Sequence, residues 1–238
     1  MTLTENNSVP SGGTEPSRHD GADHRTDRPD TAVDAVLYDF GNVLVGWEPR
    51  GALRRGLTPR AVETFLHEVD FDAFNRRQDA GRTWAEGIDD LRRSRPEHVH
   101  GVETYLTHFA DSLTGPVEGS AALVEDLEAR GLRLYGLTNW SAELFHHAAL
   151  AAPATLRMRD VLVSGREGLA KPDPQIFRLA IERFGLVPER TVFVDDSPAN
   201  VAAAASLGLV AVRFETTDGF RRDLRALGVE VPPPVARP

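Results

Sequence analysis

Residues 36–45 read VLYDFGNVLV, an apolar run interrupted by an aspartate, a glycine and an asparagine. Residues 35–40, at the start of this stretch, are almost continuously apolar, as is typical of a strand covered on both faces. Further runs of this kind span 132–137, 161–164, 191–194 and 210–214. These runs predict the buried strands of a parallel sheet.

Helical patterns separate the predicted strands. An apolar stripe over 121–127 ends near Gly131, and another over 176–181 ends at Gly185. Glycine suits the left-handed position that follows a helix. Ser197-Pro198 suits the start of a helix over 199–207. The alternation of strands and helices predicts an α/β fold with a doubly wound, parallel-sheet, Rossmann-like core.

The stretch 48–118 breaks this alternation, since it has several helical patterns and no clear strand. Thr58-Pro59 marks one helix start, and Thr83 with Glu86 forms a capping box for another. We therefore predict a helical subdomain over 48–118, inserted into a core formed by 32–47 and 119–230. Residues 1–31 are too polar to form a core and are expected to be a disordered tail. The Pro-rich end, 231–238, is also expected to lie outside the fold.

Composition excludes several classes of protein. The 238 residues include no cysteine, which excludes a disulfide scaffold, a Cys-ligated zinc site and a thiol nucleophile. A net charge of −9 argues against a nucleic-acid partner, because the summed field repels phosphate. No apolar run is long enough for a membrane span, and residues 1–31 lack the apolar stretch of a secretory signal, so we expect neither feature. We therefore expect a cytoplasmic protein with neither nucleic acid nor membrane as a partner.

Polar side chains of unusual kind follow the predicted strands. Asp39 follows the first, Thr138 and Asn139 the second, and Asp195-Asp196 the fourth. The carboxyl ends of parallel strands meet at one edge of a sheet, where ligands bind. The carboxylates of Asp39, Asp195 and Asp196 would repel one another there, and an all-oxygen set of this kind suits Mg²⁺. A nucleophile, a metal and an anion clamp are the parts needed for covalent phosphoryl transfer.

Lys171 stands out by composition. Of the 27 lysines and arginines, it is the single lysine, and it lies in the segment Gly168–Pro174, ahead of a predicted helix. An ammonium is a compact point charge, whereas a guanidinium is a broad planar fork. A chain that otherwise uses arginine therefore indicates a local need for the smaller cation at this position.

In the order and spacing of these motifs, the chain from about Ala35 to Gly228 resembles the haloacid dehalogenase-like hydrolase superfamily. The helical insertion resembles the C1 cap of that superfamily. The resemblance implies that Asp39 is the nucleophile, that Thr138 binds the transferred group and that Lys171 orients it and balances charge. It also implies a Mg²⁺ ion held by Asp39, Asp195 and the backbone carbonyl of Gly41, with Asp196 acting through water. We further predict that Gly41, Asn42 and Asn139 contact the substrate.

The sequence departs from the superfamily pattern at Gly41. Phosphatases of the superfamily usually carry a second aspartate at this position, two residues after the nucleophile. This aspartate protonates the leaving oxygen and later activates water. The Asp-Phe-Gly-Asn motif over 39–42 resembles a subgroup that includes sugar-phosphate phosphatases and members that carry only a dehalogenase-like label. Loss of a general acid costs roughly 10²–10⁴ in rate. Glu48 is one candidate for a substitute proton donor.

The inserted subdomain is expected to select the substrate. Its polar segment, 74–82, offers Arg76, Arg77 and Arg82 for a second anionic group, or else it is a solvated, Arg-rich helix end. Trp47 and Trp140 either line the pocket or pack in the core.

We therefore expect a Mg²⁺-dependent hydrolase of a small phosphomonoester, a sugar- or metabolite-phosphate phosphatase, that acts through an aspartyl-phosphate as a monomer or homodimer. One alternative is a metal-independent, hydrolytic 2-haloacid dehalogenase, although such enzymes usually carry tyrosine where this chain has Gly41. A second alternative is a weakly catalytic binding or regulatory protein.

Overall fold

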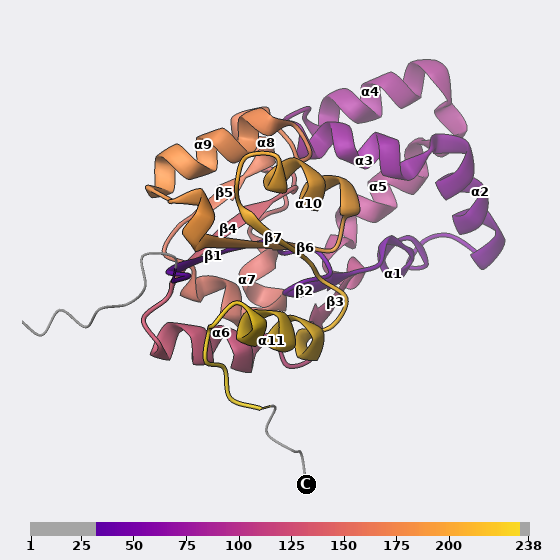
Figure 1. Cartoon of the computed structure of the whole chain (residues 1–238). Coiled ribbons are helices and arrows are strands. Elements are labelled where there is room, and N and C mark those ends of the chain that lie inside the picture. The colour runs from indigo at the N-terminus through magenta and orange to yellow at the C-terminus, as the bar shows by residue number, and fades with distance from the viewer. Residues whose placement is uncertain (1–31, 234–238) are drawn as a thin grey trace, which may run out of the picture.

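The computed structural model of the chain describes residues 32–233. The tail predicted over 1–31 lies outside the described residues, as do residues 234–238. A five-stranded parallel sheet lies at the centre of the fold, in the order β5-β4-β1-β6-β7 (Figure 1). Its strands are β1 (Ala35–Tyr38), β4 (Arg133–Thr138), β5 (Val161–Val163), β6 (Thr191–Asp195) and β7 (Val210–Arg213). All five coincide with the predicted apolar runs.

Helices cover both faces of the sheet, which explains why its strands are largely apolar. Leu37 of β1 lies in register with Tyr135 on one side and Phe193 on the other, and all three face α9 (Pro174–Phe184) and α10 (Pro198–Ala205). Residues on the opposite face pack against α6 (Ser120–Ala129) and α11 (Thr217–Ala226). Two short helices, α7 (His147–Ala151) and α8 (Ser164–Glu167), complete the core. The predicted doubly wound α/β fold is confirmed.

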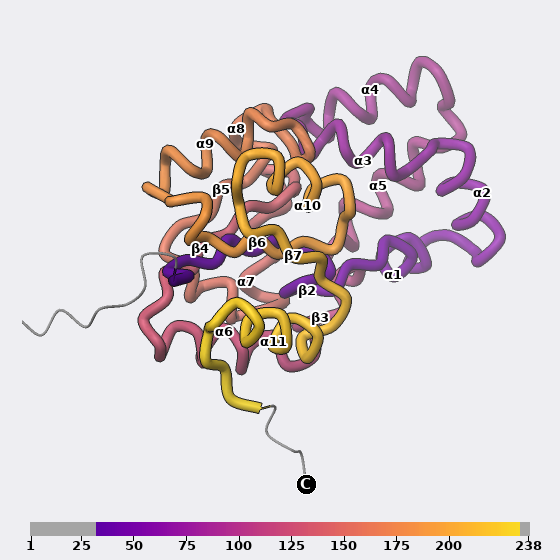
Figure 2. Tube along the Cα trace, viewed as in Figure 1, coloured from indigo at the N-terminus to yellow at the C-terminus, as the bar shows by residue number. Residues whose placement is uncertain are grey.

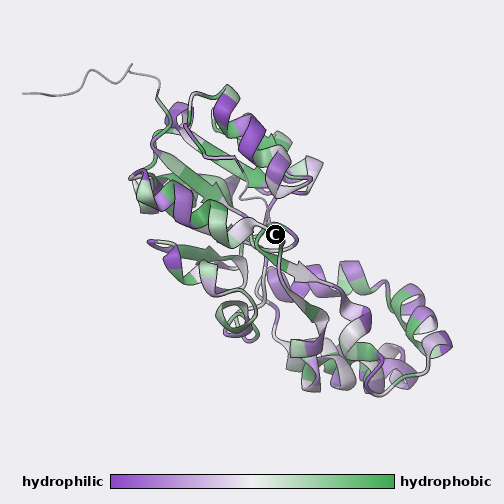
Figure 3. Ribbon diagram, turned by 90° about the horizontal axis from the view of Figure 1, so that it is seen from below, coloured by the Kyte–Doolittle hydropathy of each residue, from purple (hydrophilic) through white to green (hydrophobic). Residues whose placement is uncertain are grey.

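A helical insertion leaves the core after the first strand. The tube in Figure 2 passes out through β2 (Val45–Trp47) and returns through β3 (Leu113–Pro116). Between these strands lie α1 (Pro49–Leu53), α2 (Pro59–Val69), α3 (Phe71–Asp79), α4 (Trp84–Ser94) and α5 (Val99–Thr107). Figure 3 shows these helices beside the sheet, to which β2 and β3 connect them. The exact division into 32–47, 48–118 and 119–230 stays a prediction.

Two details of the predicted organisation are wrong. Residues 48–118 do contain a strand, β3, which pairs antiparallel with β2. Its four residues are half-buried or exposed in alternation and include a glycine and a proline, so no apolar run signals it. Val231, placed outside the fold by the sequence, is 5% exposed and packs in the core. Arg225 donates a hydrogen bond from Nε to its carbonyl at 2.8 Å, which helps to hold the chain end there.

Along the described residues, every helix is either too short or too polar to serve as a membrane span.

The predicted capping box at α4 is present and gives a stability prediction. The backbone N–H of Glu86 donates to the Thr83 hydroxyl at 3.2 Å, and the Glu86 carboxylate accepts from the Thr83 backbone N–H at 2.9 Å. We expect Thr83→Ala to lower the free energy of unfolding by about 1 kcal/mol, measured by urea denaturation. Thr64→Ala, at an exposed position inside α2, is the control. Equal stability of the two variants would contradict a stabilising role for the cap.

Candidate active site

Asp39 lies directly after β1, at the carboxyl edge of the sheet. Its side chain is almost fully buried, with 7% of the residue exposed. The backbone N–H of Phe40 donates to Asp39 Oδ1 at 2.7 Å, which fixes one carboxylate oxygen. The backbone N–H of Asp39 itself donates to the carbonyl of Val194 at 2.9 Å, so the residue stays registered with β6. Asp39 is thus held rigidly beside the end of the neighbouring strand.

Lys171 joins the two strand ends. Its Nζ lies 2.9 Å from Asp39 Oδ1 and 2.6 Å from Asp195 Oδ2, and it also donates to the carbonyl of Leu137 at 2.8 Å. No part of the Lys171 side chain is exposed. The three N–H groups of the ammonium can therefore all be used, by two carboxylates and one strand-end carbonyl. The single lysine of the chain lies where the sequence predicted, among the strand-end motifs.

The backbone of Lys171 is fixed to the end of β4. Asn139 accepts from the Lys171 backbone N–H through Oδ1 at 2.8 Å and donates from Nδ2 to the Lys171 carbonyl at 2.9 Å. This pair of bonds uses both ends of the Asn139 amide. Asn139, predicted to contact the substrate, thus also positions the lysine.

Asp195 and Asp196 follow β6. Asp195 is fully buried, and Asn200 donates from Nδ2 to both of its carboxylate oxygens, at 2.9 and 3.0 Å. Asp196 is half-buried and accepts from Asn42 Nδ2 at 3.3 Å. Asn42 has a left-handed backbone, with φ of 56°, and is exposed rather than part of a pocket wall. Its position favours support of Asp196 over contact with a substrate.

The donor set formed by Asp39, Asp195 and Asp196 suits a hard divalent cation. One oxygen from each carboxylate lies within 4.8 Å of the others. Three carboxylates facing one ammonium leave an excess of negative charge, which a cation would balance. Oxygen ligands of this kind suit Mg²⁺. The residues present therefore fit the predicted metal.

The charges of the site perturb one another. Burial raises the pKa of Asp39 to about 7, the Lys171 ammonium opposes this rise, and Asp195 adds to it. Burial disfavours the charged form of Lys171, but Asp39 and Asp195 outweigh that effect and raise its pKa. Burial, followed by the charge of Asp195, raises the pKa of Asp196. The lysine is therefore held as a cation.

Thr138 supplies a hydroxyl that has no partner within the described chain. Thr138 is fully buried at the end of β4, and its Oγ1 makes no hydrogen bond. A buried hydroxyl without a partner costs free energy, so it indicates a bound group that completes it. A phosphoryl oxygen has the chemistry to do so.

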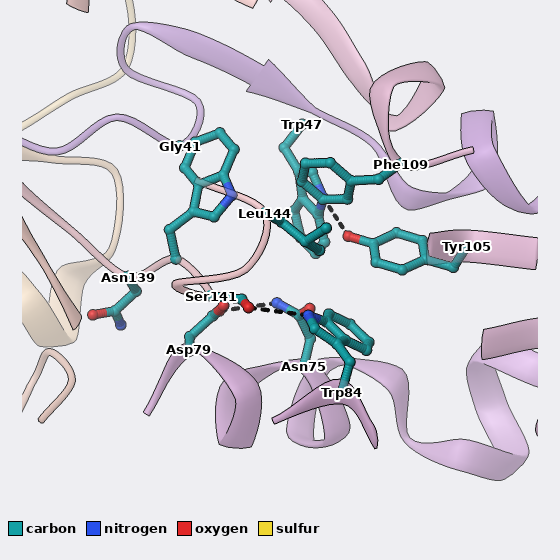
Figure 4. Close-up of a pocket in the computed structure, with 11 residues that line it drawn as sticks. Gly41, Trp47, Asn75, Asp79, Trp84, Tyr105, Phe109, Asn139, Ser141 and Leu144 are labelled. Atoms are coloured by element: carbon teal, nitrogen blue, oxygen red, sulfur yellow. Dashed lines mark hydrogen bonds between the residues drawn. The ribbon is translucent and has the colours of Figure 1, made fainter. Parts of the chain in front are cut away.

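A cavity of about 120 Å³ lies between this edge of the sheet and the helical insertion. Gly41 and Asn139 line it from the core side. Figure 4 shows Asn75, Asp79 and Trp84 on the helices of the insertion, facing the Ser141 loop. The aromatic residues of the lining are Trp47, Trp84, Tyr105, Phe109 and Trp140. Both tryptophans left open by the sequence therefore line the cavity.

Of the two readings left open for the segment 74–82, the structure agrees with the solvated, Arg-rich helix end for Arg76 and Arg77 and places no arginine of the segment in the cavity lining. Arg76 and Arg77 are exposed. Arg82 pairs with Asp90 at 2.9 Å and lies 4.9 Å from the centre of the Phe74 ring. No arginine appears among the described residues that line the cavity, so a second anionic group finds no cation there.

Asn75 and Asp79 line the cavity instead and were missed. Asn75 donates from Nδ2 to Asp79 Oδ2 at 2.9 Å. A signal for them exists in the sequence. Both residues lie at helical spacing from Phe71, on the apolar face of α3, where uncharged side chains are the rule.

A model of the haloacid dehalogenase-like hydrolase family matches residues 33–208 of this chain. The chain belongs to that family. This haloacid dehalogenase-like hydrolase is 27% identical to acyl-CoA dehydrogenase family member 10 of Mus musculus, over 88% of the chain and 20% of that protein. It thus spans only one fifth of that relative. It is 23% identical to sesquiterpene phosphatase astK of Aspergillus oryzae, over 83% of the chain and 97% of that protein.

Solved structures share the fold of the hydrolase. The HAD family enzyme bt-2542 from Bacteroides thetaiotaomicron superposes with a TM-score of 0.67 at 20% identity, over 82% of this chain and 99% of that one. The same enzyme has been solved in complex with magnesium and inorganic phosphate. L-2-haloacid dehalogenase from Xanthobacter autotrophicus superposes with a TM-score of 0.55 at 16% identity, over 83% and 84% of the two chains. These likenesses bear on the fold and do not separate the two reactions.

Proposed function

We propose that the protein is a Mg²⁺-dependent phosphatase of a small phosphorylated metabolite and acts through an aspartyl-phosphate. The observation that carries this proposal is the cluster of Asp39, Lys171 and Asp195 beside the unpartnered Thr138 hydroxyl. It offers a carboxylate nucleophile, a fixed cation and a free donor within one buried site. A relative that is itself a phosphatase, astK, lends support.

In the proposed reaction, Asp39 attacks phosphorus through the carboxylate oxygen that Phe40 does not hold. Lys171 keeps Asp39 oriented, and the Thr138 hydroxyl donates to a phosphoryl oxygen. The bond from phosphorus to the leaving oxygen breaks as the aspartyl-phosphate forms, and water then cleaves that intermediate to restore Asp39. Asp39, Asp195, Asp196 and the Gly41 carbonyl would hold Mg²⁺. The ion would neutralise charge on the phosphoryl oxygens.

The helical insertion lines the cavity, and we propose that it selects the substrate. We propose that it is a C1 cap, and that the Asp-Phe-Gly-Asn motif places the chain in the corresponding subgroup. The cavity beneath the insertion is aromatic and has one carboxyl, Asp79, in its lining. A leaving group that carries no negative charge of its own suits it best. We further propose a cytoplasmic location and a monomer or homodimer.

The 2-haloacid dehalogenase alternative fits the cavity less well. A 2-haloacid carries a carboxylate, and the described residues that line the cavity include no cationic side chain. Burial of an anion without a partner is costly. Metal-independent displacement of a halide would use Asp39 as the nucleophile but would leave Asp195 and Asp196, which cluster with it, without a metal to hold.

The metal separates the two reactions. We expect chelation to abolish phosphatase activity and added Mg²⁺ to restore it. At a hundredfold excess over Kd, the ion would stabilise the native state by about 2.7 kcal/mol. For a chain of this size, that corresponds to a rise in Tm of about 5–10 °C, measured by calorimetry. Asp195→Asn should lose both effects, whereas Asp218→Asn, at an exposed position of α11, should keep them. Halide release that chelation does not change, without any phosphatase activity, would favour the dehalogenase.

A further inference from the structure

Gly41 leaves a gap beside the nucleophile. A Cβ built on Gly41 would meet nothing within 4 Å, so neither backbone nor side chain fills the space where an acid could stand. Glu48, the substitute named from the sequence, does not serve there. Its carboxylate accepts from the Arg50 backbone N–H at 3.2 Å as the cap of α1, and it forms an ion pair with the Arg50 guanidinium.

One carboxyl does share a cavity with Gly41. Asp79 is the last residue of α3 and is 9% exposed. Asn75 donates to Asp79 Oδ2 at 2.9 Å and so fixes the orientation of the carboxyl in the cavity lining (Figure 4). Among the described residues of the lining, Asp79 is the one carboxyl. Tyr105, the other titratable residue there, has its hydroxyl occupied as the acceptor of Trp47 Nε1 at 3.2 Å.

The surroundings of Asp79 favour its protonated form. Burial raises the pKa of Asp79 to about 7, the Ser141 backbone N–H opposes this rise, and the negative charge of Asp39 adds to it. The titratable groups that face it are Asp39 from the core and Tyr105 from α5. A group that titrates near the working pH is best suited to give up a proton and take it back.

We propose that Asp79 is the general acid and base of this enzyme and performs from the helical insertion the task for which Gly41 has no side chain. The inference rests on the phosphatase function proposed above. It adds a catalytic residue supplied by the part of the chain that also lines the substrate cavity.

The proton balance closes over both steps. As the Asp39 carboxylate attacks phosphorus, the electron pair of the breaking bond passes to the leaving oxygen, and Asp79 gives that oxygen its proton. An alcohol and the Asp79 carboxylate result. Water then attacks the aspartyl-phosphate and loses a proton to Asp79, while the electron pair of the breaking bond returns to Asp39. Hydrogen phosphate leaves, and Asp79 is protonated again.

Contacts across the cavity keep Asp79 near the core. Trp84 donates from Nε1 to the Ser141 hydroxyl at 3.0 Å and from its backbone N–H to the Glu143 carboxylate at 2.9 Å. These bonds tie the start of α4, five residues after Asp79, to the loop that follows β4. The acid is thus positioned by a helix of the insertion and by a loop of the core together.

The test compares leaving groups. A nitrophenolate leaves without a proton, whereas an alkoxide must receive one. We expect Asp79→Asn to lower kcat/KM on an alkyl phosphate by roughly 10²–10⁴ and to change kcat/KM on p-nitrophenyl phosphate far less. The ratio kcat/KM reports the steps up to formation of the aspartyl-phosphate, whereas kcat also contains its hydrolysis, which both esters share. Asp72→Asn, on the exposed side of the same helix, is the matched control and should leave both rates unchanged.

A rescue sharpens the test. An aspartate fits at position 41, so Gly41→Asp in the Asp79→Asn background should restore turnover of the alkyl phosphate. Equal losses of kcat/KM on both esters would show that Asp79 only binds or supports the fold and would overturn the inference, as would failure of the rescue. The wild type offers a measurement that needs no variant. A weak dependence of kcat/KM on the leaving group supports an acid, and a steep one opposes it. If the wild type, supplied with Mg²⁺, hydrolyses neither ester, the proposed function fails first, and the inference fails with it.

Discussion

The Asp39→Asn variant should fold and lose turnover by a factor of roughly 10⁴ or more. An amide can keep the hydrogen bond from the Phe40 backbone N–H, which explains why the fold should survive. It cannot attack phosphorus to give an aspartyl-phosphate. Loss of the Asp39 charge still leaves Lys171 paired with Asp195 at 2.6 Å. The measurement is kcat with saturating Mg²⁺, beside a thermal melt of the same preparation.

The control for this experiment is Asp223→Asn, at an exposed position of α11. It removes one carboxylate from the surface and should turn over like the wild type. Retention of more than about a tenth of wild-type kcat by Asp39→Asn would exclude Asp39 as the nucleophile, since loss of a covalent nucleophile is far more costly.

Lys171→Arg should lose roughly 10²–10³ in kcat although the charge is kept. The ammonium contacts Asp39, Asp195 and the Leu137 carbonyl at 2.6–2.9 Å in a space with no exposure to solvent. A guanidinium is larger and planar and cannot point three donors to those places. It would push Asp39 away from the attacking position. Steady-state kinetics with a thermal melt would check this.

A matched control tests whether the loss of kcat depends on the position of Lys171 or follows from any exchange of lysine and arginine. Arg183→Lys makes the reverse exchange at an exposed pair with Glu167 and should leave kcat unchanged. Wild-type kinetics in Lys171→Arg would mean that the single lysine is a coincidence of composition.

The core-side half of the site could be predicted from sequence because parallel strands impose it. Apolar runs mark strands that are covered on both faces, and the residues that follow them must meet at one edge. Asp39, Thr138 and Asp195 were found in this way, whereas Lys171 was found by composition, as the single lysine of the chain. The roles of these residues come from resemblance and stay predictions until tested.

The other half of the cavity depends on how the insertion packs against the core, which local patterns do not encode. From the sequence, the arginines of 74–82 were candidates for binding a second anionic group because they are positively charged. The structure turns Arg76 and Arg77 to solvent and places Asn75 and Asp79 in the cavity. Strand β3 was missed for a related reason: it is short and half-exposed, and it is fixed by pairing with β2 rather than by its own composition.

The single lysine also makes the protein an unusual subject for chemical labelling. Apart from the α-amino group, Lys171 carries the one primary amine of the chain, and its side chain is completely buried and held as a cation. An acylating reagent needs a neutral, accessible amine. The native protein should therefore resist modification at this side chain, and unfolding should expose it. Labelling at Lys171, measured separately from labelling at the α-amino group, would thus report whether the buried centre is intact.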